Sequence, residues 1–153
     1  MYELNVANSN ATSDSFADRG TFEDLHDVNE NINIAWLNDL GVNWIWFQPI
    51  HPQGIEGRQI DPATSSEYEP GSPYSIRNFW EINPFYTSNY DGALPDPISN
   101  PINYTAAMTA FQDFVTAADT GEIQLMLDFP FNHTAPDVVL GQEGVDIFAA
   151  IGN

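Results

Sequence analysis

Apolar residues of the chain gather in three short runs with the character of strands. Residues 2–7 alternate weakly between apolar and polar, residues 42–50 are almost continuously apolar, and residues 123–128 read IQLMLD. A continuous apolar run of this length is typical of a strand buried on both faces, as in a parallel sheet covered by helices. We therefore expect three strands at these positions.

Two stretches between these runs show helical spacing. The first extends from Thr21 to Gly41 and opens with Thr21 and Asp24 in the arrangement of a capping box. Its apolar positions recur every three or four residues: Leu25, Val28, Ile32, Trp36 and Leu40. The second covers residues 104–118 and has the same spacing at Tyr104, Met108, Phe111, Val115 and Ala118. Each stretch predicts one helix.

The remaining segments are polar or rich in proline and glycine. Residues 8–19 read as a loop, residues 51–103 form a long excursion without periodicity, and the tail from 137 to 153 is expected to be helical in part. Loops as long as the second are uncommon and usually functional. The order strand, helix, strand, long loop, helix, strand predicts an α/β fold with a parallel sheet.

Charge narrows the range of partners. The 153 residues include 22 acidic residues, three arginines and no lysine, for a net charge of −19. Such a chain repels phosphate backbones and anionic membranes, whereas a sugar or a metal ion stays compatible. No run is long enough to span a membrane, and the N-terminus lacks the features of a signal peptide. Localisation stays open, although this acidity is typical of proteins adapted to a saline milieu.

Asp128, Asn132 and His133 form the sharpest candidate cluster, because they follow the third expected strand. In α/β barrels the carboxyl ends of the strands carry the active site. A carboxylate and an imidazole can hydrogen-bond sugar hydroxyls, and an asparagine oxygen suits calcium. Alternatively, Asp128 caps a neighbouring element while the other two satisfy loop backbone groups. The residues alone leave both interpretations open.

Three segments together resemble the α-amylase family of glycoside hydrolases. Residues 40–50 (LGVNWIWFQPI) resemble its second-strand segment, residues 71–84 (GSPYSIRNFWEINP) its tyrosine-bearing loop, and residues 128–133 (DFPFNH) its first signature region. The resemblance implies a TIM (β/α)8 barrel, of which residues 1–153 would be an incomplete N-terminal part. That part would hold strands 1–3 and the connecting helices, about three β/α units, and would end at the start of the segment after strand 3.

The resemblance also implies roles for individual residues. Tyr74 would stack on the sugar whose bond is cleaved, and His133 would bind the hydroxyls of that sugar. Asp128 would orient the active-site arginine and nucleophile, and Asn132 would contribute an oxygen to a structural calcium ion. The substrate would be an α-glucan, an oligo- or polysaccharide, which is hydrolysed or transferred with retention. Read without the family, Tyr74 is an aromatic residue that could equally serve packing.

Several residues depart from the family pattern or stand outside it. Pro73, Asn78 and Pro130 differ from the common residues, which leaves the subfamily, the exact sugar and the calcium site open. His51 could face the pocket, although a loop histidine is more often structural, and His26 is expected to be no ligand. An acidic loop contains Asp61, Glu67 and Glu69, which could chelate a cation but are more typical of a solvated surface.

The catalytic acids of the family have no counterpart in the sequence. Retaining hydrolysis needs two carboxyls about 5–5.5 Å apart, and the family supplies them from an Arg-x-Asp motif and a later Glu, with a third acid in Asn-His-Asp. This chain has no Arg-x-Asp, and Thr134 follows its Asn-His pair. A barrel also needs eight strands and about 250 residues. We therefore expect a truncated piece that is inactive and poorly stable alone, with open sheet edges.

Two alternatives remain beside an enzyme of this family. One is a non-catalytic carbohydrate-binding relative, or the product of a decayed gene, that keeps Tyr74 and His133 without the acids. The other is a small self-contained α/β protein with a coincidental resemblance. A phosphate-binding enzyme is disfavoured, because the sequence has neither a glycine-rich strand-to-helix turn nor a lysine.

Overall fold

A computed structural model describes residues 1–55 and 71–139 of the chain. Three strands form one parallel sheet in the order β1-β2-β3, with β1 at Tyr2–Leu4, β2 at Trp44–Phe47 and β3 at Gln124–Leu127. In the register of the sheet, Ile45 of β2 pairs with Tyr2 of β1 and with Leu125 of β3. The expected strands and their parallel α/β order are confirmed, although each strand is shorter than the apolar run that predicted it.

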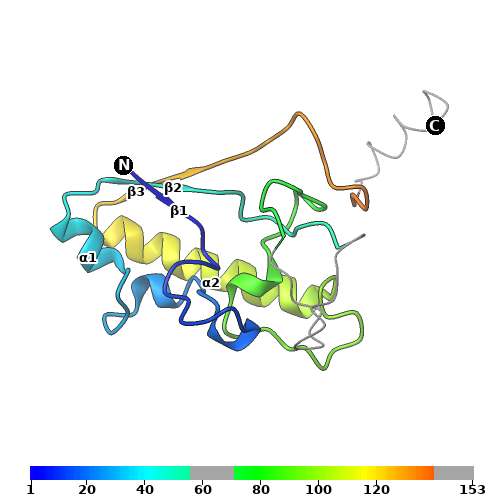
Figure 1. Ribbon diagram of the computed structural model, residues 1–153. Helices are drawn as coiled ribbons and strands as arrows, with labels where there is room; N and C mark the ends of the chain where they lie inside the picture. Colours follow the sequence, from blue (N-terminus) through cyan, green and yellow to red (C-terminus); the bar gives the residue numbers. More distant parts are fainter. Residues whose placement is uncertain (56–70, 140–153) are drawn as a thin grey trace.

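The helical elements all lie on one side of this sheet (Figure 1). Helix α1 covers Ile34–Asp39, and the long helix α2 covers Pro101–Thr120 and runs beneath the three strands. Three short 3-10 helices lie in the connections: η1 (Phe16–Asp18), η2 (Asp24–His26) and η3 (Pro84–Tyr86). The described chain therefore has two layers, a sheet and a set of helices on one of its faces.

An aromatic cluster joins these two layers. Phe47 of β2 and Phe114 of α2 are fully buried, with ring centroids 5.6 Å apart in an edge-to-face arrangement. Phe22 lies 5.9 Å from Phe47 and 6.1 Å from Phe114, so the segment before η2 closes the same cluster. Rings of this size contribute most of the buried apolar area in a small core. The sheet, α2 and the chain after β1 are thus held together at one point.

The opposite face of the sheet is largely exposed. Parallel partners share a face, so Glu3, Trp46 and Met126 point away from the helices, as do Trp44 and Gln124. Trp44 is 36% and Met126 43% exposed, whereas Ile45 and Phe47 on the helix side are fully buried. The second strand was expected to be buried on both faces. This is wrong for the described residues, because no described helix or strand packs against the face that carries Trp44 and Met126.

The first predicted helix is also wrong over most of its length. Its capping box forms, since Thr21 N–H donates to Asp24 Oδ2 over 2.7 Å, but only the 3-10 turn η2 follows. Asp27 then accepts a hydrogen bond from the backbone of Asn29, and Asn33 donates to the carbonyls of Asp27 and Glu30. Such side-chain bonds to nearby backbone compete with the helical ladder. The helix therefore begins only after Asn33, and Val28 is 81% exposed.

The second predicted helix is confirmed and is longer than expected. Asn100 accepts a hydrogen bond from Ile102 N–H, and Pro101 occupies the first turn, which together set the start of α2. Of the predicted apolar face, Tyr104 and Ala118 are buried, but Val115 is 38% exposed. Its place in the core is taken by Phe114, which the spacing did not identify.

The long excursion after β2 contains little regular structure where it is described. Residues 71–100 include η3 and an isolated antiparallel bridge between Gln53 and Ile76, which agrees with the loop expectation. Of the tail, residues 140–153 lie outside the described residues, and so does its expected helix. Within the two described ranges, no helix combines the length and apolar character that a bilayer crossing requires.

We predict that Asn33→Ala loosens helix α1 locally. Asn33 caps this helix by accepting from Trp36 N–H over 2.9 Å, and loss of such a cap costs about 0.5–2 kcal/mol. Amide hydrogen exchange of α1 should then accelerate by about tenfold, since 1.4 kcal/mol corresponds to a factor of ten. Asn31→Ala, which removes an exposed amide two residues earlier, is the matched control and should leave exchange unchanged. Equal exchange in both variants would show that Asn33 does not define the helix start.

Candidate functional site

The loop that carries Tyr74 is held between the segments that follow β2 and β3. On one side, Gly54 N–H donates to Ser75 O over 2.8 Å and Arg77 N–H donates to Pro52 O over 2.9 Å. On the other side, Ala135 N–H donates to Ile76 O over 2.7 Å. Ile76 itself is fully buried. Backbone bonds from both sides thus fix the loop at the edge of the sheet where β2 and β3 end.

An ion pair strengthens the second of these connections. Arg77 Nε lies 3.3 Å from Asp137 Oδ2, and both side chains are mostly buried, with 13% and 15% exposed. Asp137 Oδ2 also accepts a hydrogen bond from Ile55 N–H over 3.0 Å. The carboxylate therefore contacts the Tyr74 loop and the chain after β2 at once. This pair was not anticipated from the sequence, although an arginine in a chain with only three arginines and no lysine was a usable signal.

The structure brings together the three residues predicted to bind substrate. Asp128 directly follows β3, and its N–H donates to Phe47 O over 3.0 Å, which continues the sheet by one residue. The Tyr74 hydroxyl donates to Asp128 Oδ2 over 3.0 Å. His133 Nε2 lies 2.9 Å from the backbone oxygen of Tyr74. Residues separated by more than fifty positions in the sequence therefore meet at the carboxyl end of β3.

His133 is exposed but engaged through both of its ring nitrogens. Its Nδ1 lies 2.9 Å from Asn132 Oδ1, and its Nε2 faces the Tyr74 carbonyl. A carbonyl oxygen only accepts, so Nε2 must carry a hydrogen to bond the Tyr74 carbonyl. In the neutral ring Nδ1 then accepts a hydrogen bond, which the Asn132 amide group donates if its nitrogen, rather than its oxygen, faces the ring. In this arrangement His133 satisfies a loop backbone group, as the structural interpretation of the cluster proposed. A sugar hydroxyl would have to share or replace that contact.

The surroundings of Tyr74 raise the pKa of its phenol. Partial burial raises the pKa of its phenol above the ordinary value of 10.0, and the hydrogen bond to Asp128 and the negative charges of Asp128 and Glu3 raise it further. The hydroxyl therefore stays protonated and keeps donating to Asp128 at neutral pH. The phenol is a fixed donor rather than an acid for catalysis.

Asn132 by itself would supply only one of the ligands that a calcium site needs. Calcium takes six to eight oxygen ligands, and the side-chain amide of Asn132 is already engaged with the ring of His133. Among the described residues no three histidine or acidic side chains cluster as metal ligands. Asn132 could supply at most one oxygen of a coordination shell, so we derive no step of the chemistry from calcium. Asp61, Glu67 and Glu69 lie outside the described residues.

The two remaining histidines serve the packing of the loops. His51 is 5% exposed, its Nδ1 lies 2.9 Å from Glu81 O, and its ring packs 4.6 Å from that of Phe129. Burial lowers the pKa of His51, with the Glu81 bond opposing the shift, so the ring is neutral at pH 7. His26 Nδ1 lies 3.0 Å from Phe22 O, within the same turn of chain.

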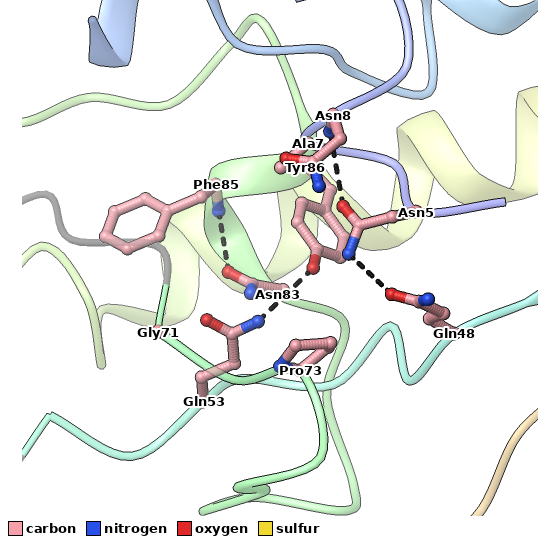
Figure 2. A pocket seen from close by; sticks show the side chains of 10 residues that line it. All are labelled: Asn5, Ala7, Asn8, Gln48, Gln53, Gly71, Pro73, Asn83, Phe85 and Tyr86. Atoms are coloured by element: carbon pink, nitrogen blue, oxygen red, sulfur yellow. Dashed lines mark hydrogen bonds between the residues drawn. The ribbon is translucent and has the colours of Figure 1, made fainter. Parts of the chain in front are cut away.

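A small cavity beside the Tyr74 loop was not anticipated from the sequence. It has a volume of about 190 Å³ and is lined by amide side chains at the ends of β1 and β2, among them Asn5 and Gln48 (Figure 2). Asn5 Nδ2 donates to Gln48 Oε1 over 2.8 Å. The rule that strand ends carry functional residues was considered for His51 after β2 and for the residues after β3. Asn5 and Gln48, which follow β1 and β2, satisfy the same rule.

Comparison with known proteins supports the resemblance. No family model matches the chain. A cyclomaltodextrin glucanotransferase from Geobacillus stearothermophilus is 31% identical over 114 residues, which are 74% of this chain and 13% of the transferase. The structure of an alpha-amylase from Lactobacillus plantarum matches with a TM-score of 0.62 and 25% identity, over 95% of this chain and 25% of that one.

A noncanonic maltogenic alpha-amylase from Thermotoga neapolitana shares the fold as well. It matches with a TM-score of 0.57 and 22% identity, over 94% of this chain and 28% of that one. The chain therefore spans only a small part of the length of its relatives. Together, these matches confirm the resemblance that the three sequence motifs indicate.

We predict that Asp128→Asn lowers the pKa of Tyr74 toward 10.0. The substitution removes a negative charge and weakens the hydroxyl's acceptor, but burial remains, so the pKa should fall only part of the way. The pKa of Tyr74 is higher in the folded chain than in the unfolded chain. The stability that the Tyr74–Asp128 pair contributes is therefore complete below pH 10 and is lost as the pH rises through the pKa of the folded state. Titration of a labelled Tyr74 Cζ by NMR measures the shift. An unchanged pKa in Asp128→Asn would show that the two side chains do not interact in solution.

Proposed function

We propose that this chain, a relative of the α-amylase family of glycoside hydrolases, forms the first three β/α units of a catalytic (β/α)8 barrel that acts on α-glucans. The observation that carries the proposal is the meeting of Tyr74, Asp128 and His133 at the carboxyl end of β3. The family motifs assign Tyr74 and His133 to sugar binding and Asp128 to orienting the active-site arginine and nucleophile, and the three residues come from two distant segments. The reaction would be retaining hydrolysis or transglycosylation.

The geometry supports a division of labour among these side chains. The hydrogen bond to Asp128 fixes the Tyr74 phenol at its tip, so its ring can offer a face to a sugar without having to be ordered on binding. Asp128 uses Oδ2 for this bond, and no described residue donates to its Oδ1. That oxygen would be free to orient an arginine, as the family motif implies. His133 would bind hydroxyls, and Asn132 would add one oxygen to any calcium site.

The exposed face of the sheet supports the barrel part of the proposal. Trp44, Trp46 and Met126 project from it, and a sheet that closes on itself fills its interior with such side chains. We propose that further strands cover this face in a complete barrel. The 153 residues alone would then be inactive, because they lack the Arg-x-Asp motif, and would be poorly stable.

The second candidate is a carbohydrate-binding relative without activity, or the product of a decayed gene. It shares the Tyr74 loop and differs only in the catalytic acids. The sequence of the transcript beyond the codon for Asn153 distinguishes the two. A continuing frame with Arg-x-Asp, a glutamate and Asn-His-Asp supports the enzyme, whereas an immediate stop codon removes the enzyme proposal for this polypeptide.

We predict that Tyr74→Ala weakens binding of maltotriose. Loss of the aromatic face should raise the Kd by about tenfold, given 0.5–1.5 kcal/mol for an aromatic contact beyond its buried area. Isothermal titration of the full-length protein that contains this chain measures the effect. The control is Trp80→Ala, because the Trp80 side chain is exposed. Tyr90→Ala is unsuitable, because the Tyr90 ring packs 5.1 Å from that of Phe85. Equal affinity of wild type and Tyr74→Ala would remove Tyr74 from the site.

We also predict that residues 1–153 alone do not cleave maltooligosaccharides. Without the two flanking carboxyls, the chain should show no release of reducing sugar above the rate in buffer. The same segment should also lack a cooperative thermal transition, because one face of its sheet is exposed. Turnover by the purified segment, lost in Asp128→Ala, would contradict the assignment of the chemistry to residues that this sequence lacks.

A further inference from the structure

His51 belongs to a four-ring cluster, made with Phe79, Phe129 and Phe131, beside the proposed substrate site. The centroid of its ring lies 4.6 Å from that of Phe129, which in turn lies 5.3 Å from Phe131. Phe131 lies 6.2 Å from Phe79, and Phe79 lies 6.0 Å from His51. The cluster joins the chain after β2, the Tyr74 loop and the chain after β3, and His51 is its only buried member.

The part of this cluster that follows β3 connects two residues of the proposed site. Phe129 comes directly after Asp128, and Phe131 lies two residues before His133. The hydrogen bond of Phe131 N–H stays within this segment, with Phe129 O as its acceptor 3.0 Å away. Of the two described ring contacts that join residues 129–131 to other segments, the one with His51 is the shorter. The position of this segment therefore depends on the histidine ring.

The surroundings of His51 favour its neutral form. Nδ1 lies 2.9 Å from Glu81 O, and a carbonyl oxygen only accepts, so Nδ1 carries a hydrogen. Nε2 is buried and has no hydrogen-bond partner among the described residues. A proton on Nε2 would create a buried, charged N–H group without an acceptor, which is costly. Burial accordingly lowers the pKa of His51, and the bond to Glu81 opposes this shift only in part.

The charged side chains of the adjoining segments do not stabilise a proton on His51. Residues 50–55, which include the histidine, hold no other titratable group. Those on the other two segments are Tyr74, Arg77, Glu81, Asp128, His133 and Asp137. Arg77 pairs with Asp137, and Asp128 accepts a hydrogen bond from the Tyr74 hydroxyl. Beside burial, the pKa of His51 responds to the backbone of Glu81.

We propose that neutral His51 is a positioning residue of the substrate site, which holds residues 129–131 in place between Asp128 and His133 and releases them when it is protonated. The inference rests on the proposed function, because this segment matters through its two neighbours in the site. Acid favours the open segment, since a solvated His51 takes up a proton that the buried ring does not. The contribution of His51 to the closed form is therefore complete above pH 6.5 and falls as the pH drops toward its lowered pKa.

His133 does not give the same response, although it lies in the same stretch of chain. A proton on its Nδ1 is donated to Asn132 Oδ1, which lies 2.9 Å away. Its Nε2 keeps the bond to the Tyr74 carbonyl. Protonation of this exposed ring thus preserves both of its contacts, whereas protonation of His51 leaves a buried charge unpaired.

The test is amide hydrogen exchange of the full-length protein that contains this chain, at pH 7 and at pH 5. The amides of Asp128 and Phe131 report on the segment, because they donate to Phe47 O and Phe129 O. After correction for the intrinsic effect of pH on exchange, both should open more often at pH 5, by up to about 25-fold. This limit holds for a pKa near 6.5 in the open form. Ordinary carboxylates are still ionised at pH 5.

Two variants remove the titration in different ways. His51→Phe keeps a ring against Phe129, and His51→Asn keeps a donor for Glu81 O. In each variant the corrected exchange should be equal at pH 7 and pH 5, whatever its absolute rate. His26→Asn is the matched control and should keep the full pH response, since His26 Nδ1 also bonds a backbone oxygen, Phe22 O, but lies outside the cluster.

Two results would overturn the inference. One is a pH response of the His51 variants equal to that of the wild type. The other is a pKa of His51 at or above 6.5 in an NMR titration of the wild-type ring, the result expected if the Phe129 ring attracted the imidazolium. This titration needs no variant, so the inference stays testable even if both His51 variants fail to fold.

Maltotriose separates this inference from the proposed function. A sugar bound at the site at pH 7 should slow the opening of residues 129–131, because it binds the closed form. If excess maltotriose slows exchange but the pH response persists in both His51 variants, the inference is wrong and the proposed function stands. If the variants lose the pH response but maltotriose has no effect, His51 holds the segment and the proposed function fails. If neither effect occurs, both are wrong.

Discussion

The structure depends on burial of one face of a three-stranded sheet. Phe47 from β2, Phe114 from α2 and Phe22 from the chain after β1 meet in a single cluster, in which Phe47 packs edge-to-face against both other rings. The strands are too short to be stable without such packing, because a few residues of sheet bury little surface. Once this cluster forms, the carboxyl ends of β2 and β3 lie side by side. Every proposed ligand contact lies at that edge.

The site then depends on how a loop without regular structure is fixed at this edge. Residues 71–79 are bonded to the chain after β2 by Gly54 and Arg77, and to the chain after β3 by Ala135 and the ion pair with Asp137. A loop held from two sides loses little further freedom when a ligand binds. This explains how Tyr74, far from Asp128 in the sequence, can keep a hydrogen bond to it without a helix or strand of its own.

Much of the fold could be predicted from the sequence, because parallel strands and the long helix have strong periodic signals. The first helix could not, since Asp27 and Asn33 bind nearby backbone and end the helical ladder, although the apolar spacing continues through them. That Tyr74 and Asp128 belong to one site was implied by the family motifs, not by periodicity, and their hydrogen bond was not predicted. The amide cavity was missed because Asn5, Gln48 and Asn83 are unremarkable alone and gain meaning only where three segments converge.

The use of the arginines agrees with the proposal of a neutral ligand at this edge of the sheet. Arg19 donates to the backbone oxygens of Phe16, Phe85 and Thr87, and Arg77 pairs with Asp137, so both described cations hold loops together. A chain with a net charge of −19 repels an anionic ligand. The two described arginines are engaged within the protein and do not offset this repulsion. Hydroxyl groups need no counter-charge, and the amides and the phenol at this edge supply both donors and acceptors. The same charge distribution that opposes phosphate is therefore compatible with the neutral sugar that we propose as ligand.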